Sequence, residues 1–412
     1  MILDIPLVMS SPFVTHTIVT TIARKAHPTP REPAGSCIVD NYVDIMHTGA
    51  VHDGIRCMVM RGGTSKGLYF LADDLPADVA SRDDLLLRVM GSPDSRQIDG
   101  MGGAHPLTSK VAVIARASAD TADVDYHFLQ VVVEEAVVTD RQNCGNLLAG
   151  VAPFALERGL VAPPAGDSAT VRIHMVNTGG LATATVPLSE GRPCYDGPAT
   201  ISGVPGTAAP IRLDFEGVAG SSCGALLPTG RVVDEVEGLA VTLIDNGMPV
   251  VVLRAGDLGV TGHEACAELE ADTSLRETLE RVRLAAGPLM NLGDVAATTV
   301  PKLSLVAAPR AGGAIATRTF IPHRCHDAIG VLGAVSVATA TLLPDGPAAE
   351  VAELGSADDG DDGAVVTIEH PTGTFDAAVD LALVDGVPVV ERAGIIRTAR
   401  KLMDGTVFPR QP

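Results

Sequence analysis

The stretch NLLAGVAPFALERGL (146–160) carries apolar side chains on nearly every face of the helix that its composition favours. A helix that is apolar all round must be buried. A second helix of this kind, AIGVLGAVSVATATLL (328–343), is predicted in the other half of the chain. Each lies among β-rich segments, so each must be wrapped by a curved sheet. We therefore predict an α+β fold with two similar domains, each with a central apolar helix.

The segments around these helices alternate or are rich in β-branched residues. Amphipathic helices are expected at 79–90 and 264–287, where apolar residues recur at helical spacing. Strands are expected at 57–60, 67–70, 110–115, 125–139, 169–176, 211–215, 239–245, 250–255 and 302–308.

Polar residues that include a cysteine precede both apolar helices, as NCGN (143–146) and as RCHD (324–327). Backbone N–H groups at the start of a helix favour anions. Two similar domains would turn both helix starts toward one cleft. We therefore expect an anion-binding site at the domain interface.

Composition and charge exclude several classes of function. The 412 residues contain 30 Lys+Arg and 50 Asp+Glu, a net charge of −20. A chain this acidic repels phosphate backbones and anionic lipids, so we expect no nucleic-acid and no membrane partner. Aromatic residues make up 3%, which disfavours stacking platforms for bases or sugars.

Cysteine usage and the N-terminal segment indicate a reduced, cytoplasmic protein. The seven cysteines are scattered and form no CxxC pair, so a disulfide framework or a structural zinc site is not expected. The apolar N-terminal segment is interrupted by Asp4 and Pro6 and is too short and polar to span a membrane.

Domain boundaries follow from where the patterns sharpen. Residues 1–51 mix Pro, Thr and His without periodicity, and we predict a poorly ordered N-terminal extension. Residues 52–188 are predicted to form the first domain and residues 189–412 the second. The final strand of the chain is expected to pack back on the first domain.

Cys144 and Lys110 are the two candidates for proton transfer. Cys144 stands at the predicted start of a helix, where the helix dipole lowers the pKa of a thiol. The alternative is that Cys144 is a small residue of the hydrophobic core, but its neighbours Asn and Gly do not favour a core position. Lys110 follows the Gly-rich run IDGMGGAHPLTS, and a partly desolvated lysine can act as a general base. The alternative is a surface lysine.

The turn RGGTSKG (61–67) is interpreted as a carboxylate-binding turn. Arg61, Thr64, Ser65 and Lys66 offer side-chain donors, and the two glycines permit close backbone approach. A phosphate loop is the alternative, but the GxxxxGK[ST] spacing is missing.

The segment IPHRCHD (321–327) crowds polar and thiol side chains before the second apolar helix. A zinc site would need further ligands that the spacing does not supply. We interpret the segment as polar lining of the anion site, and Lys302 and Arg318 as added cations for a multiply charged ligand. Surface placement is the alternative for both cations.

The sequence contains no catalytic-triad, Walker-loop, zincin or flavin signature, so we expect no cofactor and no metal. The remaining lysine, thiol, Gly-rich turns and cations suit proton transfer at a carbon that a carbonyl or carboxylates make acidic.

Several motifs closely resemble the PrpF family of methylaconitate isomerases and relatives. They are MRGGTSKGLYF (60–70), GSPDSRQIDGMGGAHPLTSKVAVI (91–114), QNCGNLLAGVAPFALERGLV (142–161), GSSCGALLPTG (220–230), LIDNGMPVVVL (243–253), LAAGPLMNLGDV (284–295) and RTFIPHRCHDAIGVLGAVSVAT (318–339). The resemblance covers about residues 52–410. Within the family, the motifs look most similar to the tautomerases that act on 4-oxalomesaconate in bacterial gallate and protocatechuate catabolism.

The resemblance implies the diaminopimelate epimerase fold, with two similar domains whose mostly antiparallel sheets wrap a central helix. It places the family's proton-transfer pair on Lys110 and Cys144. A departure from the epimerases is that HDAIGVLGA has no second cysteine at the corresponding turn, and Cys325 lies several residues too early. We expect substrate binding by Arg61, Gly62, Gly63, Thr64, Ser65, Lys66, Met101, Gly102, Gly103, Ser109, Asn143, Gly145, Asn146, Lys302, Arg318, His323 and Arg324.

The function that this resemblance implies is a cofactor-independent proton shift in a keto-tricarboxylate, with 4-oxalomesaconate as the expected small-molecule substrate. Isomerisation of methylaconitate, aconitate or methylitaconate is the alternative within the enzyme class. A non-catalytic accessory protein of an iron–sulfur dehydratase is the alternative from another class. A homodimer is an assembly that this interpretation allows.

Overall fold

The computed structural model describes residues 54–141, 143–355 and 363–411, which belong to one compact unit, His52–Pro412. The predicted N-terminal extension, residues 1–51, lies outside the described residues. No helix in the described ranges is long and apolar enough to cross a membrane.

Strands dominate the secondary structure. In chain order they are β1 (Ile55–Gly62), β2 (Ser65–Leu71), β3 (Lys110–Arg116), β4 (Val124–Val131), β5 (Val138–Thr139), β6 (Ser168–Met175), β7 (Gly180–Ser189), β8 (Arg192–Pro193), β9 (Pro210–Phe215), β10 (Asp234–Val236), β11 (Leu239–Asp245), β12 (Pro249–Arg254), β13 (Lys302–Ala307), β14 (Ile315–Phe320), β15 (Ala364–His370), β16 (Gly373–Val384) and β17 (Val387–Val407).

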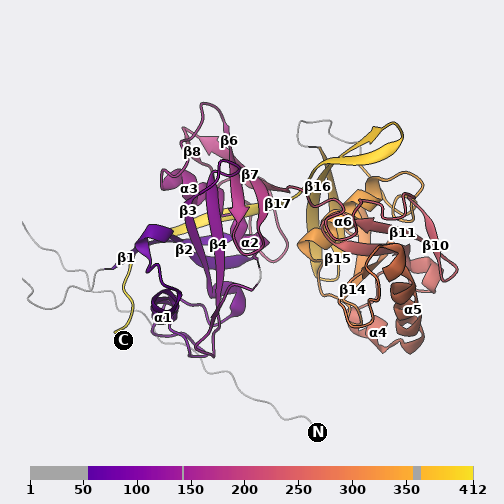
Figure 1. The fold of residues 1–412 in the computed structure, drawn as a ribbon, viewed down its shortest axis with the longest axis horizontal. Helices are drawn as coiled ribbons and strands as arrows, with labels where there is room; N and C mark the ends of the chain where they lie inside the picture. Colours follow the sequence, from indigo (N-terminus) through magenta and orange to yellow (C-terminus); the bar gives the residue numbers. More distant parts are fainter. Residues whose placement is uncertain (1–53, 142, 356–362, 412) are drawn as a thin grey trace, which may run out of the picture. The chain divides into compact units, whose positions relative to one another are not determined.

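The helices are α1 (Val79–Met90), α2 (Gly145–Leu148), α3 (Val151–Glu157), α4 (Cys266–Ala271), α5 (Thr273–Leu289) and α6 (Val331–Leu342). Short 3₁₀ turns occur at Ala72–Asp74, Pro106–Thr108 and Ala255–Leu258. The fold is therefore mixed α+β, as the sequence predicts (Figure 1). Most of the strand pairs are antiparallel.

Eight of the strands close into a ring around α2 and α3. The hydrogen-bonded order is β1, β2, β3, β4, β6, β7, β9 and β17, and β17 pairs with β1 again. The short helix α3 packs against β3, β6 and β7 and is buried on almost every side, with Val151 and Phe154 fully covered. The apolar composition of 146–160 thus reflects a helix inside a closed sheet.

The helix α6 is the second buried apolar helix. It packs against β11, β12, β15, β16 and β17, and its residues from Gly333 to Thr341 are all buried. The helix begins at Val331, three residues later than the sequence predicts, after Gly330 in extended conformation.

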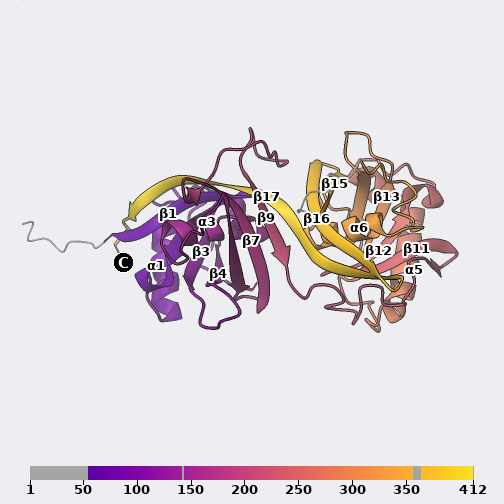
Figure 2. The same ribbon diagram turned by 90° about the horizontal axis from the view of Figure 1, so that it is seen from above.

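Strand β17 runs through the whole strand arrangement (Figure 2). Its first part pairs with β16, its middle with β9 and its last part with β1. The chain's last strand is therefore hydrogen-bonded to its first described strand.

Two predicted helices are broken in the structure. The helix predicted over 146–160 divides into α2 and α3 at Ala149–Gly150, where a Cβ on Gly150 would meet the hydroxyl of Tyr69. That hydroxyl donates a hydrogen bond of 2.6 Å to the carbonyl of Leu147. The helix predicted over 264–287 divides into α4 and α5 at Asp272, which leaves the helical conformation to cap α5. The prediction of α1 over 79–90 is confirmed.

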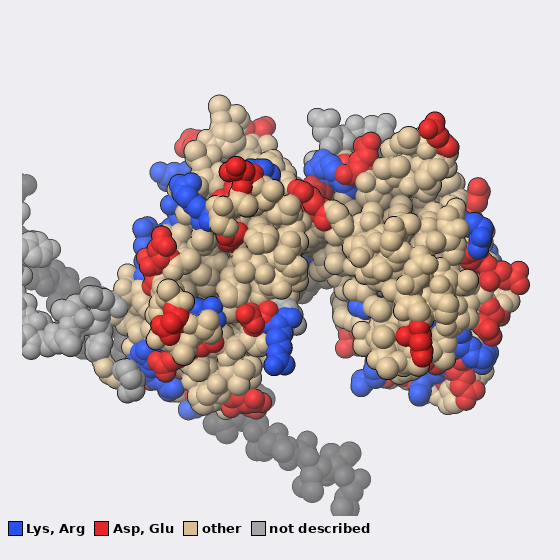
Figure 3. All heavy atoms as spheres, in the orientation of Figure 1, with Lys and Arg blue, Asp and Glu red and all other residues tan. Residues whose placement is uncertain are grey.

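Charged side chains of both signs are interspersed on the face of the molecule shown in Figure 3. Lys and Arg alternate with Asp and Glu there, and the described atoms on that face form no extended basic patch.

The N-cap of α5 gives a stability prediction. The Asp272 side chain accepts a hydrogen bond of 2.9 Å from the backbone N–H of Leu275. Asp272→Ala should lower the free energy of unfolding by about 1 kcal/mol, because a helix N–H loses its partner. Asp272→Asn retains a capping oxygen and should remain near the parent value. Urea denaturation of both variants checks this, and equal losses would contradict the capping role.

Candidate functional site

The turn after β1 and the start of α2 lie against each other. A Cβ on Gly62 would meet the backbone oxygen of Asn146, and a Cβ on Gly63 would meet its side chain. The Asn146 amide donates a hydrogen bond of 3.0 Å to the hydroxyl of Thr64. Because Gly63 also adopts a φ of +52°, both the space and the backbone conformation require glycine there. The structure thus brings two motifs singled out from the sequence together.

Cys144 is the N-cap residue of α2 and is 8% exposed. Its carbonyl accepts a hydrogen bond of 3.2 Å from the hydroxyl of Tyr126 on β4. The Asn143 side chain accepts from the Cys144 N–H and its amide lies 2.8 Å from the sulfur of Met175. These contacts fix the backbone at the thiol, and among the described residues none takes a hydrogen bond from the thiol itself.

Lys110 is the first residue of β3 and is 7% exposed. Its ammonium donates a hydrogen bond of 3.0 Å to the Gln130 side-chain oxygen and lies 4.9 Å from the centre of the Phe128 ring. Among the described residues the ammonium has no carboxylate partner. The Lys110 side chain is therefore buried with one polar partner, the Gln130 side chain.

Lys110 and Cys144 are on the same face of the sheet. Lys110 pairs with Gln130, and Tyr126 lies four residues from Gln130 along β4, so the side chains of all three project to one side. Since Tyr126 bonds to Cys144, this side is the interior of the ring that holds α2. The Lys110 side chain and the segment of Cys144 therefore both lie on the inner side of the ring.

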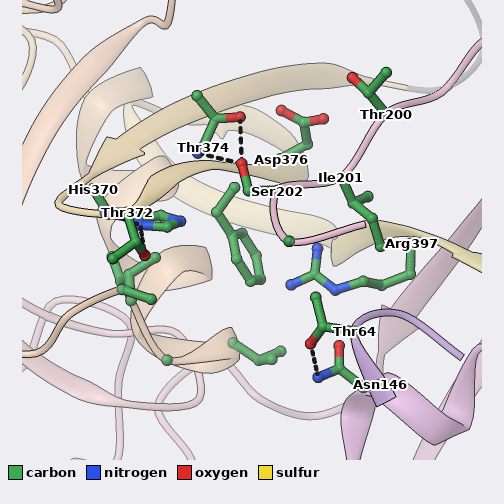
Figure 4. Close-up of a pocket in the computed structure, with 16 residues that line it drawn as sticks. Thr64, Asn146, Thr200, Ile201, Ser202, His370, Thr372, Thr374, Asp376 and Arg397 are labelled. Carbon is green, nitrogen blue, oxygen red and sulfur yellow. Dashed lines mark hydrogen bonds between the residues drawn. The ribbon is translucent and has the colours of Figure 1, made fainter. Parts of the chain in front are cut away.

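A cavity of about 430 Å³ opens beside the start of α2 (Figure 4). Of the predicted site residues in the described part of the chain, Thr64 and Asn146 line it, whereas Lys110 and Cys144 do not. Asn146 follows Cys144 by two residues, so the cavity adjoins the thiol's segment. The lining residues are Thr64, Asn146, Thr200, Ile201, Ser202, Gly203, Ala328, Ile329, Gly330, Val331, His370, Thr372, Thr374, Phe375, Asp376 and Arg397.

The start of α6 forms one wall of this cavity through Gly330 and Val331. A Cβ on Gly145 would lie 3.6 Å from a methyl group of Val331. The starts of α2 and α6 are therefore neighbours, and backbone N–H groups of both helices are near one space.

Lys302 is at the start of β13 and close to the start of α6. A Cβ on Gly330 would lie 3.9 Å from its ammonium nitrogen. Burial lowers the pKa of Lys302. Burial, and next the charge of Lys302, also lower the pKa of His326, which favours the neutral imidazole there.

Two predicted cations are held by backbone carbonyls. Arg61 donates to the carbonyls of Gly63 and Thr398, which ties β1 to β17. Arg318 is 8% exposed and donates to the carbonyls of Glu264 and Thr317. Both guanidiniums therefore stabilise the framework at their present positions.

His323 and Arg324 lie on the surface, beside Glu280 and Glu270 of the α4–α5 pair, and are outside the cavity lining.

Lys66 is half-buried on β2, and the Ser65 hydroxyl is buried without a partner among the described residues. Met101 and Gly103 are exposed in the loop before β3. In that loop Gly102 packs on the Gln97 side chain, to which Ser109 donates a hydrogen bond of 2.7 Å.

In the described ranges no group of three or more His, Cys, Asp or Glu side chains is arranged to hold a metal ion.

The cavity also contains residues that the sequence analysis did not single out. His370 and Thr374 come from the β15–β16 hairpin, Ser202 from the segment before β9, and Arg397 from β17. Burial lowers the pKa of His370, so its imidazole is neutral at pH 7. The sequence does contain a sign of Arg397. In AGIIRTA (393–399), the arginine stands where strand alternation predicts a buried apolar residue.

Comparisons with known proteins give one consistent result. The family model described as PrpF protein matches residues 53–410. The chain is 60% identical to the (4E)-oxalomesaconate Δ-isomerase of Novosphingobium sp. (strain KA1), over 86% of this chain and 98% of that protein. It is 58% identical to the 4-oxalomesaconate tautomerase of Pseudomonas putida, over 86% and 95%. The crystal structure of a methylitaconate Δ-isomerase superposes with a TM-score of 0.75 at 35% identity, covering 86% of this chain and 95% of that one.

The packing of Gly63 on Asn146 gives a second prediction. Gly63→Ala should lower the free energy of unfolding by about 2–4 kcal/mol, because it combines a left-handed alanine with overpacking. Gly206 has a φ of +77° and open space around it, so Gly206→Ala should cost about 1–2 kcal/mol for the backbone alone. Urea denaturation of the pair measures the difference. Equal losses would show that the contact with Asn146 does not constrain this turn.

Proposed function

The chain belongs to the PrpF family, and we propose that this isomerase moves a proton within a keto-tricarboxylate, 4-oxalomesaconate. The observation that supports the assignment from the structure is the cavity between the starts of α2 and α6. Arg397 is its one cationic lining residue among those described, and the N–H groups of two helix starts are close by. These donors would favour a bound anion, although Asp376 also lines the cavity and the whole chain carries −20.

The relatives support the substrate. Proteins with 60% and 58% identity are named for action on oxalomesaconate, and they match this chain over nearly their full lengths. Methylitaconate is the second candidate, because the methylitaconate Δ-isomerase structure has a similar fold at 35% identity. Catabolism of gallate or protocatechuate is the context that the first substrate implies.

The proposed mechanism begins with Lys110. Its buried amine removes a proton from a carbon that conjugation to the ketone makes acidic, which gives a dienolate. The helix start at Gly145–Asn146 stabilises the spread negative charge. The Gly-rich turns at 62–63 and 102–103 would add to this only if the N–H groups of Gly63 and Gly102 exchanged their present partners, the carbonyls of Thr398 and Met90. Cys144 returns a proton at the other end of the system or holds the substrate in position.

Lys302 suits a supporting role in the same mechanism. It lies beside the start of α6 and its pKa is lowered by burial, and a bound carboxylate would raise that pKa again and pair with the ammonium. The other predicted binding residues, including Arg318, His323 and Arg324, would contact substrate only if their present partners were exchanged.

The proposal includes the domain organisation predicted from the sequence. Residues 52–188 and 189–412 would form two diaminopimelate epimerase-like domains, each with one buried helix. Proton transfer without a cofactor, a cytoplasmic location and a homodimer complete the proposal.

An ultraviolet assay tests the function. Purified protein without added metal or nucleotide is mixed with freshly generated 4-oxalomesaconate, methylitaconate and methylaconitate in separate reactions. We expect rapid change of the conjugated absorbance with 4-oxalomesaconate. Turnover of methylitaconate or methylaconitate instead would move the substrate assignment to the alternative, and absence of turnover with all three would contradict the proposal.

Substitution of the proton-transfer pair tests the mechanism. Lys110→Met and Lys110→Ala should each lower kcat by about 10²- to 10⁴-fold, the usual contribution of an acid–base group. Exchange of deuterium from solvent into the substrate should fall in parallel. Lys401→Met is the matched control, because Lys401 forms a surface ion pair with Glu157 outside the site, and it should retain parent activity. Near-normal turnover by both Lys110 variants would overturn the assignment.

Cys144 is tested separately. Cys144→Ala removes the thiol but leaves the backbone contacts of the helix start, so the fold should persist. A fall in kcat with unchanged KM would indicate proton transfer, and a rise in KM alone would indicate positioning. Parent values of both constants would remove Cys144 from the mechanism.

A further inference from the structure

Arg397 occupies a core-facing position of a strand. Ile395 and Ala399 lie two residues to either side on β17, and both are buried in the main hydrophobic cluster. Side chains two apart point to the same face, so Arg397 projects inward as well. It is 7% exposed. Arginine is rarely buried without a paired charge, so its position requires an explanation.

The guanidinium is held in place but is not neutralised. It stacks over the Phe375 ring at 3.8 Å, and one nitrogen donates a hydrogen bond of 2.8 Å to the carbonyl of Ile396. Among the described residues no carboxylate forms an ion pair with it. Burial lowers its pKa to about 10, and the nearby charge of Asp376 opposes that shift, so the group is a cation at pH 7.

The Asp376 carboxylate, although it lines the same cavity, forms its hydrogen bond with another residue. It accepts a hydrogen bond of 2.8 Å from the Thr367 hydroxyl. In Figure 4 it is turned away from the Arg397 guanidinium, which projects into the cavity toward Thr64 and Asn146. The remaining donors of Arg397 are therefore open to the cavity.

The opposite wall offers a second place for an anion. The helix α6 begins after Gly330, which has no side chain to cap it, and Gly330 and Val331 line the cavity. The first N–H groups of a helix have no intrahelical partner. One cavity therefore holds a rigid guanidinium fork and an open helix start, on different elements.

We propose that Arg397 binds one carboxylate of the substrate in this cavity and thereby makes the enzyme prefer substrates with three carboxylates over those with two. The inference rests on the proposed function for the identity of the substrate. The start of α6 and the turn at Thr64–Asn146 hold the remaining carboxylates. The Phe375 ring fixes the plane of the fork, so the carboxylate is bound in one orientation.

The size of the effect follows from the kind of bond. A hydrogen bond to a charged partner contributes enough to change a dissociation constant by about 10- to 100-fold. Removal of Arg397 should weaken binding of a tricarboxylate by this factor and leave a dicarboxylate that does not use the subsite nearly unaffected.

Calorimetric titration with two non-reacting probes tests the proposal. Tricarballylate carries three carboxylates on a three-carbon chain, and glutarate lacks the central one. The parent protein should bind tricarballylate at least about 10-fold more tightly than glutarate. Arg397→Met should lose this preference, and Arg397→Lys, which retains the charge but not the fork, should keep part of it. Arg192→Met, an exposed arginine outside the cavity, is the control and should bind as the parent does.

The outcomes separate this proposal from the proposed function. If Arg397→Met retains the parent preference for tricarballylate, Arg397 does not bind the extra carboxylate, although the isomerase assignment stands. If Arg397→Met weakens both probes equally, Arg397 is not the source of the preference. If Arg397→Met does not fold, an unchanged preference in Arg397→Lys overturns the requirement for the fork. Loss of preference with no turnover of any isomerase substrate by the parent would sustain the subsite and overturn the function.

Discussion

The hydrogen bonding of β17 is the constraint on which the rest of the structure depends. This one strand pairs in succession with β16, β9 and β1, so it closes the ring around α2 and also supports the sheet that packs on α6. Arg61 reinforces the closure by donating to Thr398 across β1 and β17. Because the side-chain period of a strand is two, a shift of register by one residue would turn Arg397 out of the cavity and move its neighbours out of the core.

The site depends on backbone groups brought together by that closure. Gly62 and Gly63 allow the β1–β2 turn to lie directly on Asn146, and Gly145 at the start of α2 lies beside Val331 of α6. Helix starts supply partial positive charge that does not titrate. In the proposed function, this arrangement is what would let a chain with a net charge of −20 bind a polyanion with few cationic side chains.

Much of the fold could be predicted from the sequence, because burial on all faces has a compositional signature. The two apolar helices, the amphipathic α1 and most strands follow from periodicity. The breaks in the helices did not follow. The division between α2 and α3 depends on Tyr69 of β2, whose hydroxyl donates to the carbonyl of Leu147. The local pattern of residues 146–160 cannot indicate a contact with a residue so distant in the sequence.

By itself the sequence determined the fold class, the two buried helices and the candidate motifs around Lys110, Cys144 and Gly62–Gly63, because these depend on local pattern and residue chemistry. The tertiary structure alone decided which of the polar residues share a cavity. It joined Thr64 and Asn146 with Ser202, His370 and Arg397, and it set Arg318, His323 and Arg324 against other partners. The physical reason is that a cavity forms where strands distant in the chain pair, and that pairing depends on the closure of the whole sheet.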